Sequence, residues 1–278
     1  MTTRHRFAKH CMLLFLFLVS GCAMVLAQSV DEGFIPHSGQ DGKDVVWVPT
    51  SHDMVDIMLN LAEATPDDYL IDLGSGDGRT VIAAAKRGIR AHGIEYNPQM
   101  VELSQKRAEE AGVGGMATFA EQDLFESDFS EATVITMFLL TSINVKLRPV
   151  LLELKPGTRI VSNTFTMEEW ETDGNDSIDD PNSPWGNALL WIVPAKVAGT
   201  WKLPAGTLTL EQKFQMITGT LKTTRSSLSV EDGRLRGTQI VFTAGDAQYQ
   251  GTVDGNAIEG TVTTDGTTAA WSAEFSGN

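Results

Sequence analysis

The chain has 278 residues, of which 42% are hydrophobic and 21% charged, and its formal net charge is −15 at pH 7. This length and composition are typical of one large or two ordinary globular domains. Its two cysteines, Cys11 and Cys22, lie near the N-terminus, so the rest has none for a disulfide, a thiolate nucleophile or a zinc site. A chain this acidic repels phosphate backbones, and no local basic patch compensates, which disfavours nucleic acid as a partner.

The N-terminus has the pattern of a secretory leader. Three basic residues between Arg4 and Lys9 precede an apolar run at 12–19, as in a signal peptide. The segment Val19–Cys22 resembles the lipobox of bacterial lipoproteins, whereas Val25–Ala27 offers an ordinary cleavage site. We therefore expect residues 1–27 to be a signal peptide or lipoprotein leader and residues 28–45 to be a linker.

This leader predicts that the body is exported to the periplasm or cell envelope, either freed by cleavage or anchored by a lipid at Cys22. An uncleaved anchor is the alternative, and the body is cytosolic if the leader is not functional. Membrane contact is expected only through the leader or the lipid. Residues 1–22 hold three of the 21 basic and none of the 36 acidic residues, so their removal changes the formal charge from −15 to −18.

The region after the linker alternates between helical and extended patterns. Apolar residues from Met54 to Leu61 have the spacing of an amphipathic helix, and Thr50 with Asp53 fits a capping box at its start. Further helices are expected at 80–87, 97–111 and 149–154, and strands at 70–73, 90–95, 116–121, 132–140, 158–165 and 188–193. This alternation predicts a Rossmann-like α/β fold, a mostly parallel sheet with helices on both faces, over residues 46–195.

The sequence also predicts where one helix starts and how the last two strands of this region pair. Pro149 lies within an apolar stripe at 147–154 and predicts that the regular helix starts there rather than at Asn144. No helical pattern separates strands 158–165 and 188–193. We therefore expect these strands to pair antiparallel, with room for a short strand between them.

From about Ala198 onward the helical periodicity ends, and Thr, Gly and Gln become frequent. Alternating segments follow at 207–210, 214–217, 227–230, 238–242, 248–253, 257–262 and 270–275. Asp-Gly dipeptides beginning at 232, 254 and 265 are typical of hairpin turns. We expect residues 196–278 to form a separate all-β antiparallel meander, a small barrel or a sandwich.

A glycine turn follows the buried strand 70–73. The pattern D-x-G-x-G-x-G begins at Asp72 and places Gly74, Gly76 and Gly78 before the next helix. Glycine permits positive φ and close approach of the backbone to a ligand, and such a turn binds nucleotide-like ligands in open α/β sheets. Arg79 stands where a dinucleotide fingerprint has its third glycine, which disfavours an NAD-dependent oxidoreductase.

The spacing of this turn resembles motif I of the class I S-adenosylmethionine-dependent methyltransferases. The resemblance extends to Glu95, at the end of the second strand, where the family carries an acid that binds the ribose hydroxyls. It extends also to Asp123, after the third strand, where the family binds the adenine amine. A diol and an amine are both donors, which suits carboxylate acceptors.

The resemblance implies S-adenosyl-L-methionine as the cofactor and assigns further contacts to it. Asp72 would orient the turn or bind the methionine amino group. The backbone from Gly74 through Ser75 to Gly78 would pack along the methionine and ribose, and Leu124 or Phe125 would line the adenine ring.

More narrowly, residues 48–194 look like a bacterial group related to the small protein-lysine methyltransferases. The matching segments are Val48–Thr50, Asp72–Arg79 with Val81–Arg87, Glu95–Pro98, Asn144–Pro149 and Leu154–Gly157. The resemblance covers about half of the chain and implies a protein amine or a small molecule as the methyl acceptor.

The acceptor side is less defined than the cofactor side. Amino-methylating DNA enzymes carry Asn or Asp followed by Pro-Pro and an aromatic residue at the tip of strand four, where this chain has Leu139–Ser142. This departure argues against a nucleobase as the acceptor. Thr50, Thr141 and Asn144 are candidate substrate contacts, and the latter two are equally compatible with a role as polar residues at a helix start.

No residue is assigned to catalysis, because methyl transfer from a sulfonium needs little beyond proximity, desolvation and a free lone pair. Trp170 and Trp185 are candidates for the wall of a substrate cleft, and the carboxylates from Asp173 to Asp180 are candidates for attraction of a cation. A solvated flexible loop is the preferred interpretation of both. The scattered histidines indicate no metal.

These patterns favour an S-adenosylmethionine-dependent methyltransferase whose acceptor, oligomeric state and β-region function stay open. The alternative is a non-catalytic envelope binding protein that retains the methyltransferase fold. This alternative arises because the leader directs the body away from the cytosol, where S-adenosylmethionine is made.

Overall fold

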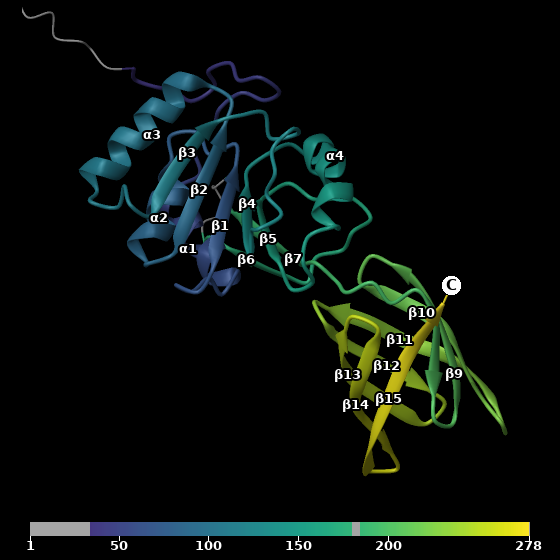
Figure 1. The fold of residues 1–278 in the computed structure, drawn as a ribbon. Coiled ribbons are helices and arrows are strands. Elements are labelled where there is room, and N and C mark those ends of the chain that lie inside the picture. The colour runs from purple at the N-terminus through teal and green to yellow at the C-terminus, as the bar shows by residue number, and fades with distance from the viewer. Residues whose placement is uncertain (1–33, 180–183, 278) are drawn as a thin grey trace, which may run out of the picture. The chain divides into compact units, whose positions relative to one another are not determined.

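The computed structural model describes residues 34–179 and 184–277 (Figure 1). The expected leader, Cys22 and the first part of the linker lie outside the described residues, so their assignment stays a prediction. Within the described ranges, no helix is both long and apolar enough to cross a membrane.

The first folded region is built on a seven-stranded sheet with the order β3-β2-β1-β4-β5-β7-β6. Its strands are β1 (Tyr69–Leu73), β2 (Arg90–Glu95), β3 (Ala117–Glu121), β4 (Val134–Met137), β5 (Arg159–Asn163), β6 (Gly174–Ser177) and β7 (Asn187–Ile192). The first five strands run parallel. β7 is antiparallel to β5 and pairs with the short β6, as the absence of a helix before it predicted.

Helices cover both faces of this sheet (Figure 1). They are α1 (His52–Leu61), α2 (Arg79–Lys86), α3 (Pro98–Glu110) and α4 (Thr141–Leu151). On one face, α1, α2 and α3 bury residues such as Met58 and Val81 against Leu70. On the other, α4 buries Leu147 against a cluster that includes Ile71. Because neighbouring residues of β1 face opposite sides, both cores are packed against the same strand, and the expected α/β fold is confirmed.

Two local predictions for these helices were wrong. The N-cap of α1 is Ser51, whose hydroxyl accepts a hydrogen bond from the Met54 amide at 3.2 Å, rather than Thr50. α4 begins at Thr141 and contains Pro149. Pro149 lacks the amide that would bond to the Val145 carbonyl, and the buried apolar face of α4 outweighs that loss.

The second folded region is a closed antiparallel barrel of eight strands. These are β8 (Gly199–Leu203), β9 (Gly206–Lys213), β10 (Met216–Thr223), β11 (Ser227–Arg236), β12 (Gln239–Ala244), β13 (Ala247–Asp254), β14 (Ala257–Thr264) and β15 (Thr267–Gly277). Successive strands pair as hairpins, and β15 returns to β8 to close the barrel. The expected antiparallel β region is therefore confirmed as a barrel rather than a sandwich.

Most of the predicted strands in this region were too short, and the first was missed. β8 carries Trp201, which is almost fully buried in the barrel core, but its surroundings in the sequence show little alternation. Closure of the barrel pairs it with both β9 and β15, and this long-range pairing stabilises a segment that its own sequence does not mark.

Candidate functional site

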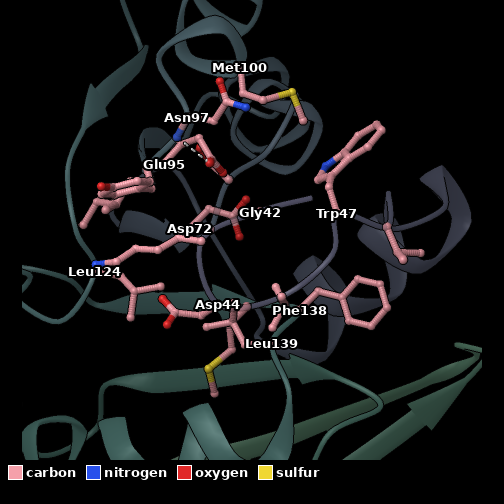
Figure 2. A pocket seen from close by; sticks show the side chains of 18 of the residues that line it. Gly42, Asp44, Trp47, Asp72, Glu95, Asn97, Met100, Leu124, Phe138 and Leu139 are labelled. Atoms are coloured by element: carbon pink, nitrogen blue, oxygen red, sulfur yellow. Dashed lines mark hydrogen bonds between the residues drawn. The ribbon is translucent and has the colours of Figure 1, made fainter. Parts of the chain in front are cut away.

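A pocket lies where the parallel strands of the sheet end. Its floor is formed by residues at or just beyond the carboxyl ends of β1, β2, β3 and β4, including Asp72, Glu95, Asp123 and Phe138. Figure 2 shows Glu95 and Leu124 on one side of the pocket and Trp47 and Phe138 on the other. Parallel strands gather their ends at one edge of a sheet, so this position is the usual ligand site of open α/β sheets.

The glycine turn adopts the backbone that the sequence predicted. Gly74, Gly76 and Gly78 have φ values of 76°, 53° and 78°, in the region that favours glycine. A Cβ on Gly78 would approach the Ser104 Cβ to 2.8 Å. Gly78 is also the N-cap of α2, so the turn presents backbone amides and a helix N-terminus to the pocket. The backbone of the turn can therefore contact a ligand directly, whereas a side chain in place of the glycine hydrogens at Gly76 or Gly78 would clash with neighbouring residues.

Asp72 lies in β1 under this turn and is 6% exposed. The Thr136 hydroxyl of β4 donates a hydrogen bond of 2.7 Å to its carboxylate. Burial raises the pKa of Asp72 to about 7, and the charge of Glu95 acts in the same direction, whereas the Thr136 hydrogen bond opposes it. A buried carboxylate so destabilised is well suited to bind a cationic group such as an ammonium.

Glu95 ends β2 and is fixed by two backbone amides. Its two carboxylate oxygens accept hydrogen bonds from the Gly76 and Asn97 amides, both at 2.9 Å. Each oxygen has further acceptor capacity toward the pocket. Asn97 in turn caps α3, because its side chain accepts from the Gln99 amide at 2.9 Å. Glu95 is therefore held in one orientation by the turn and by the start of α3, ready to accept from a diol.

Asp123 follows β3 and accepts a hydrogen bond from the Phe125 amide at 2.9 Å. It also pairs with Lys43, which lies over the ring of Tyr96 with its Nζ 4.7 Å from the centroid. The Lys43 hydrogen bond and the Phe125 amide hold the pKa of Asp123 below its usual range. Leu124, the next residue, is partly buried in the apolar cluster beneath and also lines the pocket.

The segment 40–50 lines the pocket, and within it only Thr50 was expected at the site from the sequence. Trp47 lies over the glycine turn, since a Cβ on Gly76 would approach its Nε1 to 2.4 Å. Arg79 ties this segment to the turn, because it donates to the Thr50 carbonyl at 2.7 Å and to the Asp77 carboxylate at 2.7 and 2.9 Å. The only sequence signal for this role was the Val48–Thr50 match to the family.

Asp77 is a buried acid in the glycine turn that was not singled out from the sequence. It is 2% exposed and pairs with both Arg79 and Arg107. Burial alone would raise the pKa of Asp77, but the hydrogen bonds and charges of the two arginines hold it below its ordinary value. Asp77 lines the pocket, but its carboxylate is paired with the two arginines and stabilises the turn.

Only one of the three candidate substrate residues lines the pocket. Thr50 is 8% exposed and lines the pocket. Thr141 is the first residue of α4 and is not among the pocket residues. Asn144 is completely buried, and its amide donates to the Phe165 carbonyl at 3.0 Å. Its side chain supports the loop after β5 instead of reaching toward a substrate.

The candidate cleft residues of the acidic segment differ in exposure to solvent. Trp170 is 1% exposed and packs between Trp191 and Phe214, so it does not form part of a cleft. The side chain of Asp173 is buried and paired with Arg234 at 2.8 Å, whereas Asp180 lies outside the described residues. Trp185 is 38% exposed and is the tryptophan of the segment that a substrate can reach.

The acids at the strand ends fit S-adenosylmethionine in the order in which they occur across the sheet. Asp123, Glu95 and Asp72 belong to the ends of β3, β2 and β1, which are neighbours in that order. Adenine amine, ribose hydroxyls and methionine ammonium are joined in the same order along the cofactor, and all three are donors. The Ser75 hydroxyl beside them is buried without a hydrogen-bond partner within the described part of the protein. The pocket thus has the donor-accepting groups that this cofactor needs.

Comparison with known proteins identifies the same half of the chain. The family model described as the ANTKMT methyltransferase domain matches residues 72–174. A protein-lysine N-methyltransferase of Saccharolobus islandicus is 41% identical over 152 residues, which are 54% of this chain and 90% of that protein. The adenine nucleotide translocase lysine N-methyltransferase of Mus musculus is 35% identical over 46% of this chain, but the match covers only 56% of its own length.

A solved structure is similar over the same extent. It is described as an RNA methyltransferase from Salinibacter ruber in complex with S-adenosyl-L-homocysteine. Its sequence is 46% identical, the TM-score is 0.51, and the match covers 54% of this chain and 96% of that chain. These matches cover roughly the α/β half of this chain.

Proposed function

Since the chain belongs to the family of class I S-adenosylmethionine-dependent protein-lysine methyltransferases, we propose that it methylates the side-chain amine of a lysine in a protein. The observation that carries this proposal is the Saccharolobus protein-lysine enzyme, 90% of whose length this chain matches. The family membership makes the chain a methyltransferase with S-adenosylmethionine as its methyl donor, so a non-catalytic binding role is set aside. The identity of the acceptor is the proposed part.

The chain's own residues have separable tasks in this reaction. Asp123, Glu95 and Asp72 would hold the adenine, ribose and methionine parts of the donor, and the glycine turn would pack along the donor. The bound donor supplies an electrophilic methyl group on a sulfonium. Beyond Asp72, the pocket is continued by Phe138 and Leu139 at the end of β4, which offer an apolar surface to the incoming amine.

This apolar surface favours the reactive form of a lysine. An ammonium group has no free lone pair, so the acceptor must lose a proton before it can attack. Removal from water disfavours the charged form and lowers the pKa of an amine. Phe138 and Leu139 therefore assist transfer by desolvation, and no side chain needs to act as a strong base.

An RNA acceptor is the competing interpretation, because the similar solved structure is described as an RNA methyltransferase. The charge of this chain favours protein: it carries 36 acidic against 21 basic residues. A phosphate backbone is repelled by such a surface, whereas a lysine-rich protein is attracted. The acidic segment before β7 adds to this preference with exposed carboxylates such as Glu168 and Asp176.

The proposal is tested by methyl transfer from labelled S-adenosylmethionine to three acceptors: poly-L-lysine, poly-L-arginine and total bacterial RNA. We expect ε-N-methyllysine after acid hydrolysis of the first acceptor and no label in the other two. The rate should rise between about pH 7 and 9, because more of the acceptor is then deprotonated. The variant Glu95→Ala provides the control for transfer that does not use the site. Label in RNA without methyllysine would overturn the proposal.

The export of the body is a further part of the proposed function, supported by the basic residues and apolar run before Cys22. Cell fractionation with N-terminal mass measurement tests it. A mass that includes a diacylglyceryl group on Cys22, or a mature start after Ala27, is the expected result. A full-length chain in the cytosol would contradict it.

A further inference from the structure

Three aromatic side chains from separate segments meet beside the pocket. Phe138 follows β4, Phe165 lies in the loop after β5, and Trp185 precedes β7. Their ring centroids are 5.9 Å apart for Phe138 and Phe165, 5.7 Å for Phe138 and Trp185, and 5.6 Å for Phe165 and Trp185. We call this cluster the aromatic wall. Each member contacts both others, so the wall is one continuous surface.

The aromatic wall is continuous with the cofactor pocket and open to solvent. Phe138 lines the pocket and lies in Figure 2 on the side away from Leu124. Phe138 and Phe165 are half-buried, and Trp185 is 38% exposed. Trp185 therefore presents part of its indole to solvent while it packs on the two phenylalanine rings. The wall therefore forms a path from solvent to the inner pocket.

The order of the strands places this path at the reacting end of the site. The groups suited to adenine, ribose and methionine stand at the ends of β3, β2 and β1, and the next strands in the sheet are β4 and β5. Two members of the wall, Phe138 and Phe165, follow these two strands. An acceptor that approaches along the wall therefore reaches the methionine side of the pocket without crossing the adenine or ribose positions.

The loop that carries Phe165 is held in a strained conformation. Thr164 has a φ of 66°, which is costly for a β-branched residue. Its amide donates to the Asn187 carbonyl at 2.6 Å. Phe165 is fixed through its carbonyl, which accepts from the Ser162 hydroxyl at 2.8 Å and from the Asn144 amide at 3.0 Å. Asn144 is thus a positioning residue for the wall.

We propose that the aromatic wall binds the side chain of the acceptor lysine, with its methylene stem against Phe138 and Trp185 and its amine directed into the pocket. This inference rests on the proposed function and adds the surface that selects the acceptor. A lysine presents an apolar methylene stem and a cationic end. Aromatic faces bind both, by apolar contact and by attraction of the cation to the ring.

The experiment compares Trp185→Ala, Phe165→Ala and Trp185→Phe with the wild type, using poly-L-lysine as the acceptor at saturating S-adenosylmethionine. We expect each alanine variant to raise the KM for poly-L-lysine roughly 10-fold, and Trp185→Phe to stay within about 3-fold of the wild type. The calorimetric Kd for S-adenosylhomocysteine should be the same in all four proteins. Met216→Ala, an equally exposed apolar residue at 40% in the barrel, is the matched control and should leave KM unchanged.

The outcomes separate the two proposals. Wild-type methyllysine formation with an unchanged KM in both alanine variants would overturn the aromatic wall and leave the proposed function standing. Absence of methyllysine from the wild type would overturn the proposed function together with this inference. A rise of KM in Trp185→Ala that Trp185→Phe restores, with cofactor affinity unchanged, supports the wall and is not explained by general loss of structure.

The positioning role of Asn144 has its own readout. Asn144→Asp retains the size of the side chain but loses the amide that donates to the Phe165 carbonyl. We expect it to raise the KM for poly-L-lysine in the same way as Phe165→Ala, with the Kd for S-adenosylhomocysteine unchanged. A double variant with Phe165→Ala should show no further increase, because both changes act through the same ring. If the double variant instead raised the KM by the product of the two single effects, the positioning role of Asn144 would be contradicted.

Discussion

The glycine turn of the sheet region and two hairpin turns of the barrel need glycine for different reasons. In the sheet region, a Cβ on Gly76 or Gly78 would approach side-chain atoms to under 3 Å. In the barrel, Gly255 and Gly266 also have positive φ, at 55° and 75°, but a Cβ on either would have no atom within 4 Å. The barrel needs these glycines only to turn a hairpin, whereas the sheet region also needs them to keep space at a crowded strand end.

The two regions also differ in how far apart in the sequence their neighbouring residues lie. In the barrel, strands that are consecutive in sequence are mostly neighbours in space, and buried and exposed residues alternate along them. In the sheet region, the parallel arrangement brings Asp72, Glu95 and Asp123 together from three separate strand ends. The parallel sheet therefore brings together the residues of the cofactor site, which are distant in sequence. The barrel strands mainly pack around the barrel's own hydrophobic core.

The largest expected difference is in stability, between Gly78→Ala and Gly255→Ala. The first adds a strained φ and a clash with Ser104, and we expect it to lower the free energy of unfolding by about 3 kcal/mol. The second adds only the strained φ and should cost about 1 kcal/mol. Urea denaturation of both variants measures this. Equal losses would show that the turn is not crowded.

The next effect concerns cofactor affinity. Glu95→Ala removes a carboxylate that two amides hold in place, and we expect S-adenosylhomocysteine to bind roughly 100-fold more weakly, through the loss of charge-assisted hydrogen bonds to a diol. Titration calorimetry measures it, with Glu259→Ala on the exposed surface of β14 as the control. A Kd that Glu95→Ala leaves within about 3-fold of the wild type would contradict the ribose assignment.

The smallest effect is a pH dependence that only the sheet region should show. Because the pKa of Asp72 is raised to about 7 in the folded protein, the folded state holds a proton that the unfolded state has lost above about pH 5. The contribution of Asp72 to the free energy of unfolding therefore falls as the pH rises through the raised pKa, and it changes little at higher pH. Relative to Asp72→Asn, the cofactor-free wild type should lose about 1.4 kcal/mol of unfolding free energy between about pH 6 and pH 8.

Denaturation curves of both proteins at the two pH values test this. The exposed Asp128 supplies the control, because the Ser130 amide holds its pKa below the ordinary value and Asp128→Asn should show no such difference over the same pH range. A wild type that gains stability relative to Asp72→Asn over this range would reverse the sign and contradict the burial argument.

The cofactor side of the site could be predicted from the sequence because its signals are local. A glycine turn follows a buried strand, and single acids end the next two strands, so three short segments were enough to predict the edge where they meet. The fold class was predictable for the same reason, since alternating helical and extended patterns define a parallel sheet.

The rest of the site depends on contacts between distant segments. Trp47 reaches the glycine turn from a segment without regular structure, and Phe138, Phe165 and Trp185 meet only after β4, β5 and β7 are assembled. Asn144 was a candidate substrate contact, with a polar role at a helix start as the alternative. The helix starts earlier than Pro149 indicated, and the Asn144 side chain is buried. Tertiary packing decided each of these positions.

The pairing of β1 with β4 has a consequence for how the chain folds. The hydrogen bond between Thr136 and Asp72 spans 64 residues, and β4 separates β1 from β5 in the sheet. Contacts of such sequence separation form slowly, because a long loop must close before they stabilise anything. During synthesis the cofactor edge therefore cannot assemble until the chain through Met137 is available, so cofactor binding must follow the formation of contacts that are distant in sequence.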